Sequence, residues 1–291
     1  MPEAPVFDEV VQEDSRAAPG TSWFASDVTN AATVVSARWT VTGLGVFEAY
    51  VNGKPVGKDF LKPGFTHPAK TRYAFSYDVT PLLDTAAGAV NVLAAEVSAG
   101  WWRDKIVSPS ERKGFVGRKS AFRGVLELTY ADGMTRAVGT DTRRWRCGIA
   151  GAVKAAAIFD GEDYDARVPN PVRGEGLASV PERNDEFRGE ILPTAGAEVT
   201  LREDLVLPPV KAYVWKGVTG ASSNAWGTAT VVRRYAADEK YVLEPGETLV
   251  LDFGQNAAAV PRFTFAGEQG TVLTVRPAEM LNDGNGLNSR G

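Results

Sequence analysis

Two adjacent tryptophans followed by an oppositely charged pair form the most suggestive binding motif of the sequence. Trp101 and Trp102 directly precede Arg103 and Asp104. A tryptophan exposed at the end of a strand can stack on the apolar face of a pyranose, while arginine and aspartate bond its hydroxyls. In the alternative interpretation, one tryptophan belongs to the core, the other lies on the surface, and the charged residues form a solvated pair. This structural interpretation is favoured, because aromatic residues dominate protein cores.

A second cluster is acidic. Asp160, Glu162, Asp163 and Asp165 place four carboxylates within six positions, enough oxygen for a hard cation such as Ca²⁺. Their spacing is not that of an EF-hand. In the alternative and favoured interpretation, Glu162 or Asp165 pairs with Arg167, and the segment fixes the exit of the chain from a β-sandwich. No cofactor is therefore required by the sequence, and calcium remains a hypothesis.

Other motifs of catalytic appearance lack their partners. Residues 252–254 (Asp-Phe-Gly) have the sequence of the magnesium-binding motif of protein kinases, but no His-Arg-Asp catalytic loop accompanies them. Gly43 and Gly45 lack the third glycine and the following helix of a dinucleotide fingerprint. Cys147 is the only cysteine, and the sole histidine, His67, precedes a proline. Cys147 is therefore predicted to be an inert small side chain rather than a catalytic thiol.

Composition excludes several function classes. The chain has 291 residues, of which 44% are hydrophobic and 23% charged, as expected for one large or two ordinary globular domains. A net charge of −4 provides no basic surface for nucleic acid. A single cysteine rules out an internal disulfide framework.

No apolar run approaches the ~20 residues of a membrane span, and the N-terminus lacks signal-peptide features. A cytoplasmic protein and an exported one whose signal has been removed both fit.

Short alternating segments separated by turns dominate the first half of the chain. Asn52-Gly53, between two alternating runs, predicts a hairpin with a type I′ turn. Residues 131–133 (Ala-Asp-Gly) predict a second hairpin. Thr80 before Pro81 predicts one helical turn capped by Thr80. The strands expected here are 32–42, 72–77, 91–97, 122–130 and 134–140.

A stretch without periodicity separates the two halves. Residues 168–196 are rich in proline, glycine and charge, which is typical of a linker or long connecting loop. Beyond it, Trp215 and Trp226 are predicted to be packing residues. The strands expected in this half are 212–215, 228–234, 248–253, 260–265 and 271–275.

The whole pattern predicts an all-β protein, because no sustained helical period occurs. We expect two β-sandwich modules of jelly-roll-like type, with long loops and few short helices. A lead-in arm spans residues 1–22, the first sandwich 23–195 and the second 196–291. The second sandwich is expected to be incomplete at its C-terminus, where a glycine-rich polar tail covers 282–291.

Seven motifs of the first half occur in an order that resembles the N-terminal region of bacterial α-L-rhamnosidases. Each alone is a weak β-turn motif, but the ordered set is specific. The matching segments are 41–53, 62–66, 77–83, 100–102, 130–133, 140–145 and 160–167.

The second half resembles the next module of that family, a lectin-like, concanavalin-like β-sandwich. Residues 252–256, the turn at 267–270 and residues 276–281 carry this likeness. In the family, an (α/α)₆ barrel follows these modules and holds the general acid and general base of an inverting glycosidase. This sequence has neither the barrel's long helices nor its acidic motif, so the resemblance implies no catalytic residues here. Some sugar-binding modules related to the family use calcium.

The resemblance implies three functional hypotheses. In the first, the chain is the non-catalytic front of an α-L-rhamnosidase and helps to recognise a rhamnose-containing glycan or glycoside while supporting the catalytic barrel. The parent enzyme would then release terminal α-L-rhamnose. In the second, it is a free-standing carbohydrate-binding module. In the third, it is a purely structural scaffold for a catalytic domain.

Overall fold

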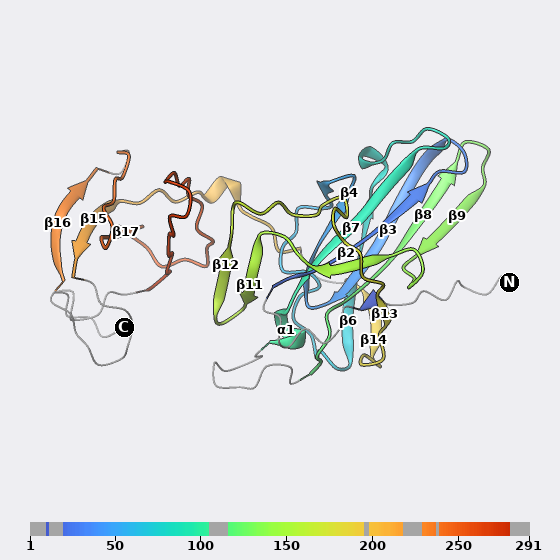
Figure 1. Cartoon of the computed structure of the whole chain (residues 1–291), viewed down its shortest axis with the longest axis horizontal. Helices are drawn as coiled ribbons and strands as arrows, with labels where there is room; N and C mark the ends of the chain where they lie inside the picture. Colours follow the sequence, from blue (N-terminus) through green and yellow to red (C-terminus); the bar gives the residue numbers. More distant parts are fainter. Residues whose placement is uncertain are drawn as a thin grey trace. The chain divides into compact units, whose positions relative to one another are not determined.

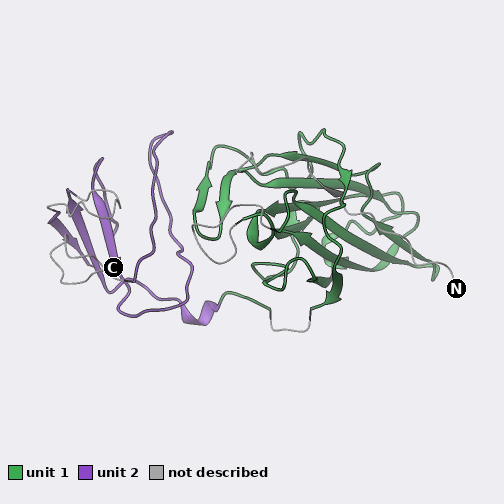
Figure 2. Ribbon diagram, turned by 90° about the horizontal axis from the view of Figure 1, so that it is seen from below, with its two compact units in different colours: residues 1–201 green, residues 202–291 purple. Residues whose placement is uncertain are grey.

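The computed structural model describes residues 10–11, 20–104, 116–194, 198–217, 229–236 and 239–279. The chain divides into two compact units, residues 1–201 and 202–291 (Figure 2). The sequence placed the boundary between residues 195 and 196. Val199 O accepts the Phe60 backbone N–H at 2.8 Å and Thr200 forms a β-bridge with Asp59, so residues 199 and 200 pair within unit 1.

Unit 1 contains two main β-sheets (Figure 1). The first has the order β13-β1-β8-β3-β6-β14, with β9 paired to β8, and the second has the order β10-β2-β7-β4-β5. The strands of the first sheet are β1 (Val10–Val11), β3 (Val34–Leu44), β6 (Thr71–Asp78), β8 (Ala121–Tyr130), β9 (Thr135–Gly139), β13 (Glu182–Arg183) and β14 (Glu190–Pro193). Those of the second are β2 (Ser22–Thr29), β4 (Val46–Val51), β5 (Lys54–Pro55), β7 (Val90–Ser98) and β10 (Arg146–Ile149).

The hydrophobic core of unit 1 lies between these sheets. Alternate residues of β4 point inward, so that Phe47, Ala49 and Val51 are buried, as the two-residue period of a strand requires. Phe122 of β8 occupies the centre, with its ring centroid 6.4 Å from Phe24 of β2 and 6.1 Å from Phe47. Because aromatic side chains contribute large buried areas, these contacts between the sheets stabilise the sandwich.

Both predicted hairpins are present. Asn52 and Gly53 have φ values of 51° and 79°, the positive values that a type I′ turn needs at both central positions. Gly133 has a φ of 83° in the turn between β8 and β9. The helical turn is also present, as the 3₁₀ helix η2 (Thr80–Leu82). The cap differs from the expectation: Asp78 Oδ1 accepts the Thr80 N–H at 3.0 Å, while Thr80 Oγ1 accepts the N–H of Ala37.

Three asparagines, of which Asn30 and Asn91 are buried and Asn52 is half-buried, join the ends of the second sheet's strands. Asn52 Nδ2 donates to Asn91 Oδ1 at 2.7 Å, and Asn91 Nδ2 donates to Asn30 Oδ1 at 3.3 Å. Asn91 Oδ1 also accepts the Asp84 N–H at 2.8 Å, while Asn52 Oδ1 accepts the Val92 N–H at 2.9 Å. The residue that forms the turn therefore also ties it to β7.

Short strands occur near both ends of unit 1. Val10–Val11, inside the expected lead-in arm, forms β1 and pairs with both β8 and β13. The predicted linker contributes β13 and β14, and β14 pairs in parallel with β6. A two-stranded sheet of β11 (Val153–Ala157) and β12 (Gly161–Tyr164) completes unit 1.

Unit 2 contains a three-stranded antiparallel sheet in the order β16-β15-β17. The strands are β15 (Lys211–Lys216), β16 (Thr230–Tyr235) and β17 (Thr248–Asp252), preceded by the 3₁₀ helix η3 (Glu203–Leu205). The expected strands at 260–265 and 271–275 do not form. Their apolar side chains are exposed, and an extended segment without packed neighbours gains too little to remain paired.

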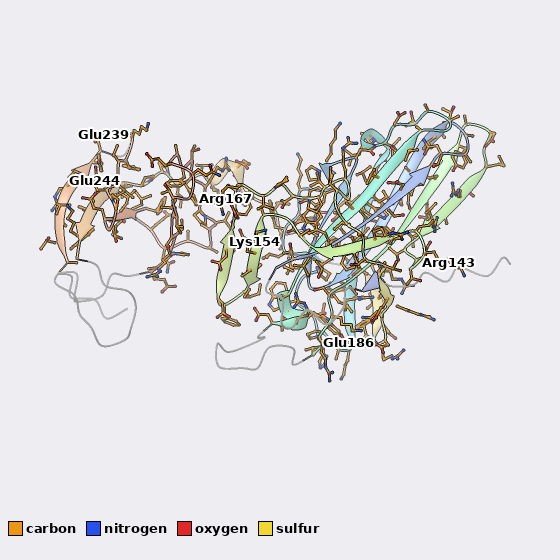
Figure 3. The ribbon with its side chains drawn as sticks, viewed as in Figure 1. Arg143, Lys154, Arg167, Glu186, Glu239 and Glu244 are labelled. Atoms are coloured by element: carbon orange, nitrogen blue, oxygen red, sulfur yellow. The ribbon has the colours of Figure 1, made fainter. Side chains whose placement is uncertain are left out.

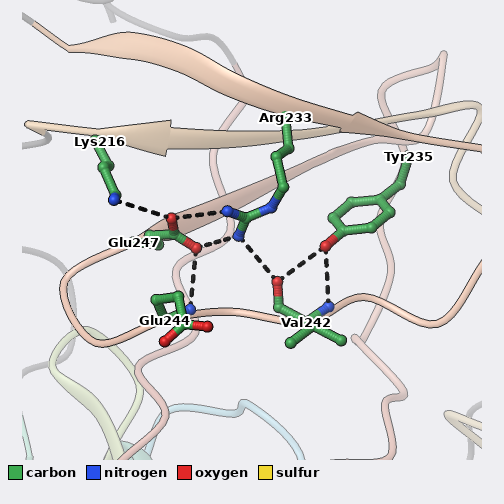
Figure 4. A network of polar contacts seen from close by, with 6 residues as sticks. All are labelled: Lys216, Arg233, Tyr235, Val242, Glu244 and Glu247. Atoms are coloured by element: carbon green, nitrogen blue, oxygen red, sulfur yellow. Dashed lines mark hydrogen bonds and ion pairs between the residues drawn. The ribbon is translucent and has the colours of Figure 1, made fainter.

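A cluster of polar contacts, which we call the clasp, joins β16 and β15 to the residues that directly precede β17 (Figure 4). Arg233 Nη1 donates to Glu247 Oε1 at 3.0 Å, and Nη2 donates to Glu247 Oε2 and, at 3.1 Å, to Val242 O. Lys216 Nζ lies 3.5 Å from Glu247 Oε1. The hydrogen bond from Arg233 and a second one from the Glu244 N–H lower the pKa of Glu247 to about 2.

The all-β prediction is confirmed. Within the part of the chain that the structure describes, the one α-helix is the single turn α1 (Gly100–Arg103). No helix among the described residues is long and apolar enough to cross a membrane.

Candidate functional site

The turn α1 positions the tryptophan pair. Gly100 has a φ of 48°, and a Cβ on it would lie 2.6 Å from the Val46 backbone nitrogen. Only glycine fits this approach, because a side chain would clash and the positive φ would strain it. The tight turn that follows sends the two neighbouring tryptophans in different directions.

Trp102 points into the protein and is 4% exposed. Its Nε1 donates to Lys119 O at 2.9 Å, and its ring makes an edge-to-face contact with Phe187 at 6.2 Å. Glu186, labelled in Figure 3, accepts the backbone N–H groups of Arg118 and Lys119 and so fixes this segment. Trp102 therefore has the environment of a core residue.

Arg103 and Asp104 are buried too. Arg103 Nε donates to Ser120 Oγ at 2.7 Å. Carbohydrate binding by these two side chains stays a prediction. Their burial differs from the solvated pair that the structural interpretation expected.

Trp101 is different, because it remains half-exposed beside Phe65. The ring centroids lie 5.8 Å apart at an interplanar angle of 58°. Phe65 is 60% exposed. Phe65 lies in a loop and Trp101 lies in α1, 36 positions later in the sequence. We call this exposed pair of aromatic side chains the aromatic corner.

A shallow hollow with a cavity volume of about 30 Å³ adjoins the aromatic corner. Trp101 and Trp102 line it together with Thr66, Thr71 and Arg72, and with glycines and prolines of the neighbouring loops. A volume of this size is about one water molecule's share of the liquid. A ligand would therefore lie across the hollow rather than inside it.

Buried charges anchor the loop that carries Phe65. Lys62 is 1% exposed, and its Nζ donates to Glu48 Oε2 at 2.9 Å. Tyr77 OH donates to Asp59 Oδ2 at 2.5 Å, and the Lys62 ammonium lies 5.8 Å from the Tyr77 ring centroid. Burial raises the pKa of Glu48 above its ordinary value, and Lys62 opposes that rise. These contacts hold residues 59–62 against the sandwich, three positions before Phe65.

Arg72 lies beneath the hollow with its guanidinium carbon 4.3 Å from the Phe187 ring centroid. Burial, with a smaller contribution from the neighbouring charge of Arg123, lowers the pKa of Arg72 to about 9. The planar guanidinium group of Arg72 packs against Phe187 and forms part of the bottom of the hollow.

The acidic turn does not bring its four carboxylates together. Among the described residues, no group of three or more histidine, cysteine, aspartate or glutamate side chains is arranged to hold a metal ion. Asp165 instead accepts two hydrogen bonds from the Arg167 guanidinium, each at 2.8 Å, which lower its pKa to about 2. Asp160, Glu162 and Asp163 are exposed along the turn and β12. The pairing of Asp165 with Arg167 was the favoured interpretation, and calcium binding stays a prediction.

The remaining candidates have structural surroundings. Cys147 is buried in β10, and its backbone N–H donates to Ser179 O at 2.9 Å. Trp215 is buried in β15. Trp226 lies outside the described residues.

Sequence reasoning missed Phe65, Lys62, Asp59 and Tyr77 as neighbours of the candidate site. The Lys-Pro-Gly sequence before Phe65 is typical of a turn, but it does not reveal that its lysine is buried. A phenylalanine directly after such a turn was the one available signal, since an aromatic residue in a loop has no strand to bury it.

Models of two protein families match the chain. One described as the α-L-rhamnosidase N-terminal domain matches residues 32–172. A second, the bacterial α-L-rhamnosidase concanavalin-like domain, matches residues 242–290. The chain belongs to the α-L-rhamnosidase family. It carries the N-terminal domain and the start of the concanavalin-like domain.

Relatives agree with this assignment. An α-L-rhamnosidase of Alteromonas sp. is 30% identical over 253 residues, and one of Streptomyces avermitilis is 31% identical over 249 residues. These matches cover 87% and 86% of this chain but 24% and 21% of the relatives. The chain thus spans about a quarter of the length of the rhamnosidases it matches.

Solved structures show the same fold. The crystal structure of the Streptomyces avermitilis α-L-rhamnosidase complexed with L-rhamnose has a TM-score of 0.59 and 26% identity, over 70% of this chain and 21% of that one. The Aspergillus terreus enzyme has a TM-score of 0.63 at 22% identity, over 79% of this chain and 26% of that one, which supports the fold alone.

Proposed function

We propose that this chain is the accessory N-terminal region of an α-L-rhamnosidase and that it recognises a rhamnose-containing glycan or glycoside for its parent enzyme. The parent enzyme would hydrolyse terminal α-L-rhamnose, with the acid and base supplied by its catalytic barrel. The single observation that carries the recognition role is the half-exposed Trp101 beside the exposed Phe65. Exposed aromatic side chains at loop tips provide the flat apolar surface on which a glycoside can stack.

Calorimetric titration of the full chain with p-nitrophenyl α-L-rhamnoside tests this proposal. We expect millimolar or tighter binding that weakens in Trp101→Ala and is retained in Tyr164→Ala. Tyr164 is a matched control because it is an exposed aromatic residue of β12, outside the aromatic corner. Repeating the titration with calcium and with EDTA tests the acidic turn. Absence of heat for the unmodified chain would contradict the recognition role.

The non-catalytic assignment has its own test. The chain is expected to release no p-nitrophenol from p-nitrophenyl α-L-rhamnoside. An inverting glycosidase needs two carboxylates roughly 6.5–9.5 Å apart across the sugar, and in this proposal the catalytic barrel of the parent enzyme supplies both. Release at an enzyme-like rate would overturn the assignment.

A second candidate, the support of a catalytic domain, is favoured by a separate observation in unit 2. Its large apolar side chains include Phe263 and Val272, which are 57% and 86% exposed. Side chains of this kind cover a partner surface in many assemblies. If the barrel of the parent enzyme is the partner, residues 260–275 exchange amide hydrogens more slowly when the barrel is present than in the chain alone. Equal exchange rates would argue against support through this segment.

A further inference from the structure

We infer that the aromatic corner and its hollow bind the planar aromatic aglycone of a rhamnoside rather than the rhamnose ring itself. This inference rests on the proposed recognition of rhamnosides and names the part of the ligand that Phe65 and Trp101 contact. It follows from the polar groups that the hollow offers, from the geometry of the two rings and from the way their loops are held.

The hollow offers few hydrogen-bonding groups. A sugar ring carries several hydroxyls, and burying them requires paired donors and acceptors. Among the described residues, no aspartate, glutamate, asparagine or glutamine lines the hollow, and its polar members are Thr66, Thr71 and Arg72. The Thr66 hydroxyl already donates to Thr71 O, and the Arg72 side chain is 3% exposed and packs on Phe187. This lining suits a ligand surface without hydroxyls.

The geometry of the corner suits a third aromatic ring. Phe65 and Trp101 meet at 58° with their centroids 5.8 Å apart, so they present two tilted apolar faces. Aromatic rings prefer offset-stacked or edge-to-face contacts with centroids 4.5–7 Å apart. An aryl ring lying across the hollow can therefore stack on one of the two rings and meet the other with its edge.

The corner is held in place before any ligand arrives. Gly100, with its positive φ, fixes the turn that presents Trp101. A hydrogen bond from Lys62 to Glu48 and another from Tyr77 to Asp59 fix the loop that presents Phe65. Because α1 and the loop of Phe65 are both anchored, little of the protein has to become ordered when an aryl ring binds. Preorganisation of this kind raises affinity.

Two ligands with the same sugar test the inference. Calorimetry on the full chain compares p-nitrophenyl α-L-rhamnoside with methyl α-L-rhamnoside. We expect the aryl glycoside to bind about tenfold more tightly, the size of effect that one aromatic contact pair gives. Phe65→Ala and Trp101→Ala are each expected to abolish this preference, while Tyr164→Ala retains it. Circular dichroism and thermal unfolding verify that the variants fold, and Phe65→Ala removes a side chain that is largely exposed.

The outcomes separate this inference from the proposed function. Equal affinities for the two glycosides in the unmodified chain would overturn the aglycone site and leave rhamnoside recognition standing. Failure of both glycosides to bind would overturn the two together. An aryl preference that persists in both Phe65→Ala and Trp101→Ala would place the aglycone elsewhere and overturn the assignment to this corner.

Discussion

Large apolar side chains lie in different surroundings in the two compact units. The described residues form two buried hydrophobic clusters, and both lie in unit 1. In the larger one, Phe122 contacts aromatic rings from both sheets. In unit 2, Val214 and Ala212 are buried in the central strand β15, whereas Phe263 and Val272 are exposed. Unit 1 therefore has a core that can stabilise it alone, while the described part of unit 2 depends on main-chain pairing and the Arg233–Glu247 clasp.

The largest expected effect is the loss of the central ring in unit 1. Phe122→Ala should lower the free energy of unfolding by about 3–5 kcal/mol, because it leaves a cavity between two packed sheets. Urea denaturation followed by tryptophan fluorescence measures this change, since Trp39 and Trp145 contact Phe122.

The matched control is Phe159→Ala, which removes the same side chain from a more exposed position of the same unit. We expect it to change stability by less than about 0.5 kcal/mol. If the two variants are equally destabilised, the sandwich core does not set the stability of unit 1.

A smaller effect is expected from the asparagine network of unit 1. Asn91→Ala should cost about 1–3 kcal/mol, because Asn52 Nδ2 and the Asp84 N–H lose an acceptor in a buried environment. Chemical denaturation measures the loss. Asn256→Ala, at an exposed position, is the control and should be neutral. A neutral Asn91→Ala would mean that the hairpin is held by its turn alone.

The segments around Glu48 and Glu247 should respond to pH in opposite directions. Glu247 has a pKa of about 2 against an ordinary value of 4.5, so the unfolded state binds more protons between these values, and the clasp weakens as pH falls through that window. The pKa of Glu48 is raised instead, so its contribution to unit 1 declines as pH rises above 4.5. Amide hydrogen exchange at different pH values, followed in peptides covering β15 and β17 and in peptides covering β4, separates the two responses.

Glu247→Gln provides the control for the acid response. It keeps the shape of the side chain but removes the charge that pairs with Arg233, so β15 and β17 should exchange faster at neutral pH and show less dependence on acid. An unchanged acid response in this variant would assign it to another carboxylate.

The smallest effect on stability is expected from the exposed segment of unit 2. The double variant Phe263→Ser and Val272→Ser should unfold within about 0.5 kcal/mol of the unmodified chain, since neither side chain is packed. It should also self-associate less in analytical ultracentrifugation, because an exposed apolar patch favours contacts between copies. Strong destabilisation would show that unit 2 has a core of its own.

Local chemistry explains what could be predicted from the sequence and what could not. The Asn52-Gly53 hairpin was predictable because a type I′ turn depends on the residues within it. The strand at 260–265 was predicted from its residue types, but a strand also needs a paired neighbour, which residue types alone do not supply. The candidate site was predicted in part: Trp101 is half-exposed as a binding residue requires, while Trp102 is buried by Phe187 and residues 117–120, far from it in the sequence.

The sequence by itself determined the all-β class, the hairpins and the membership of the α-L-rhamnosidase family, because turn residues, strand periodicity and ordered motifs are properties of the chain. Only the tertiary structure decided which of two adjacent tryptophans faces solvent, that Phe65 lies beside it, and that Lys62 is buried under the same loop. Exposure and long-range contacts depend on which distant segments pack together, and the identity of the adjacent residues does not determine that packing.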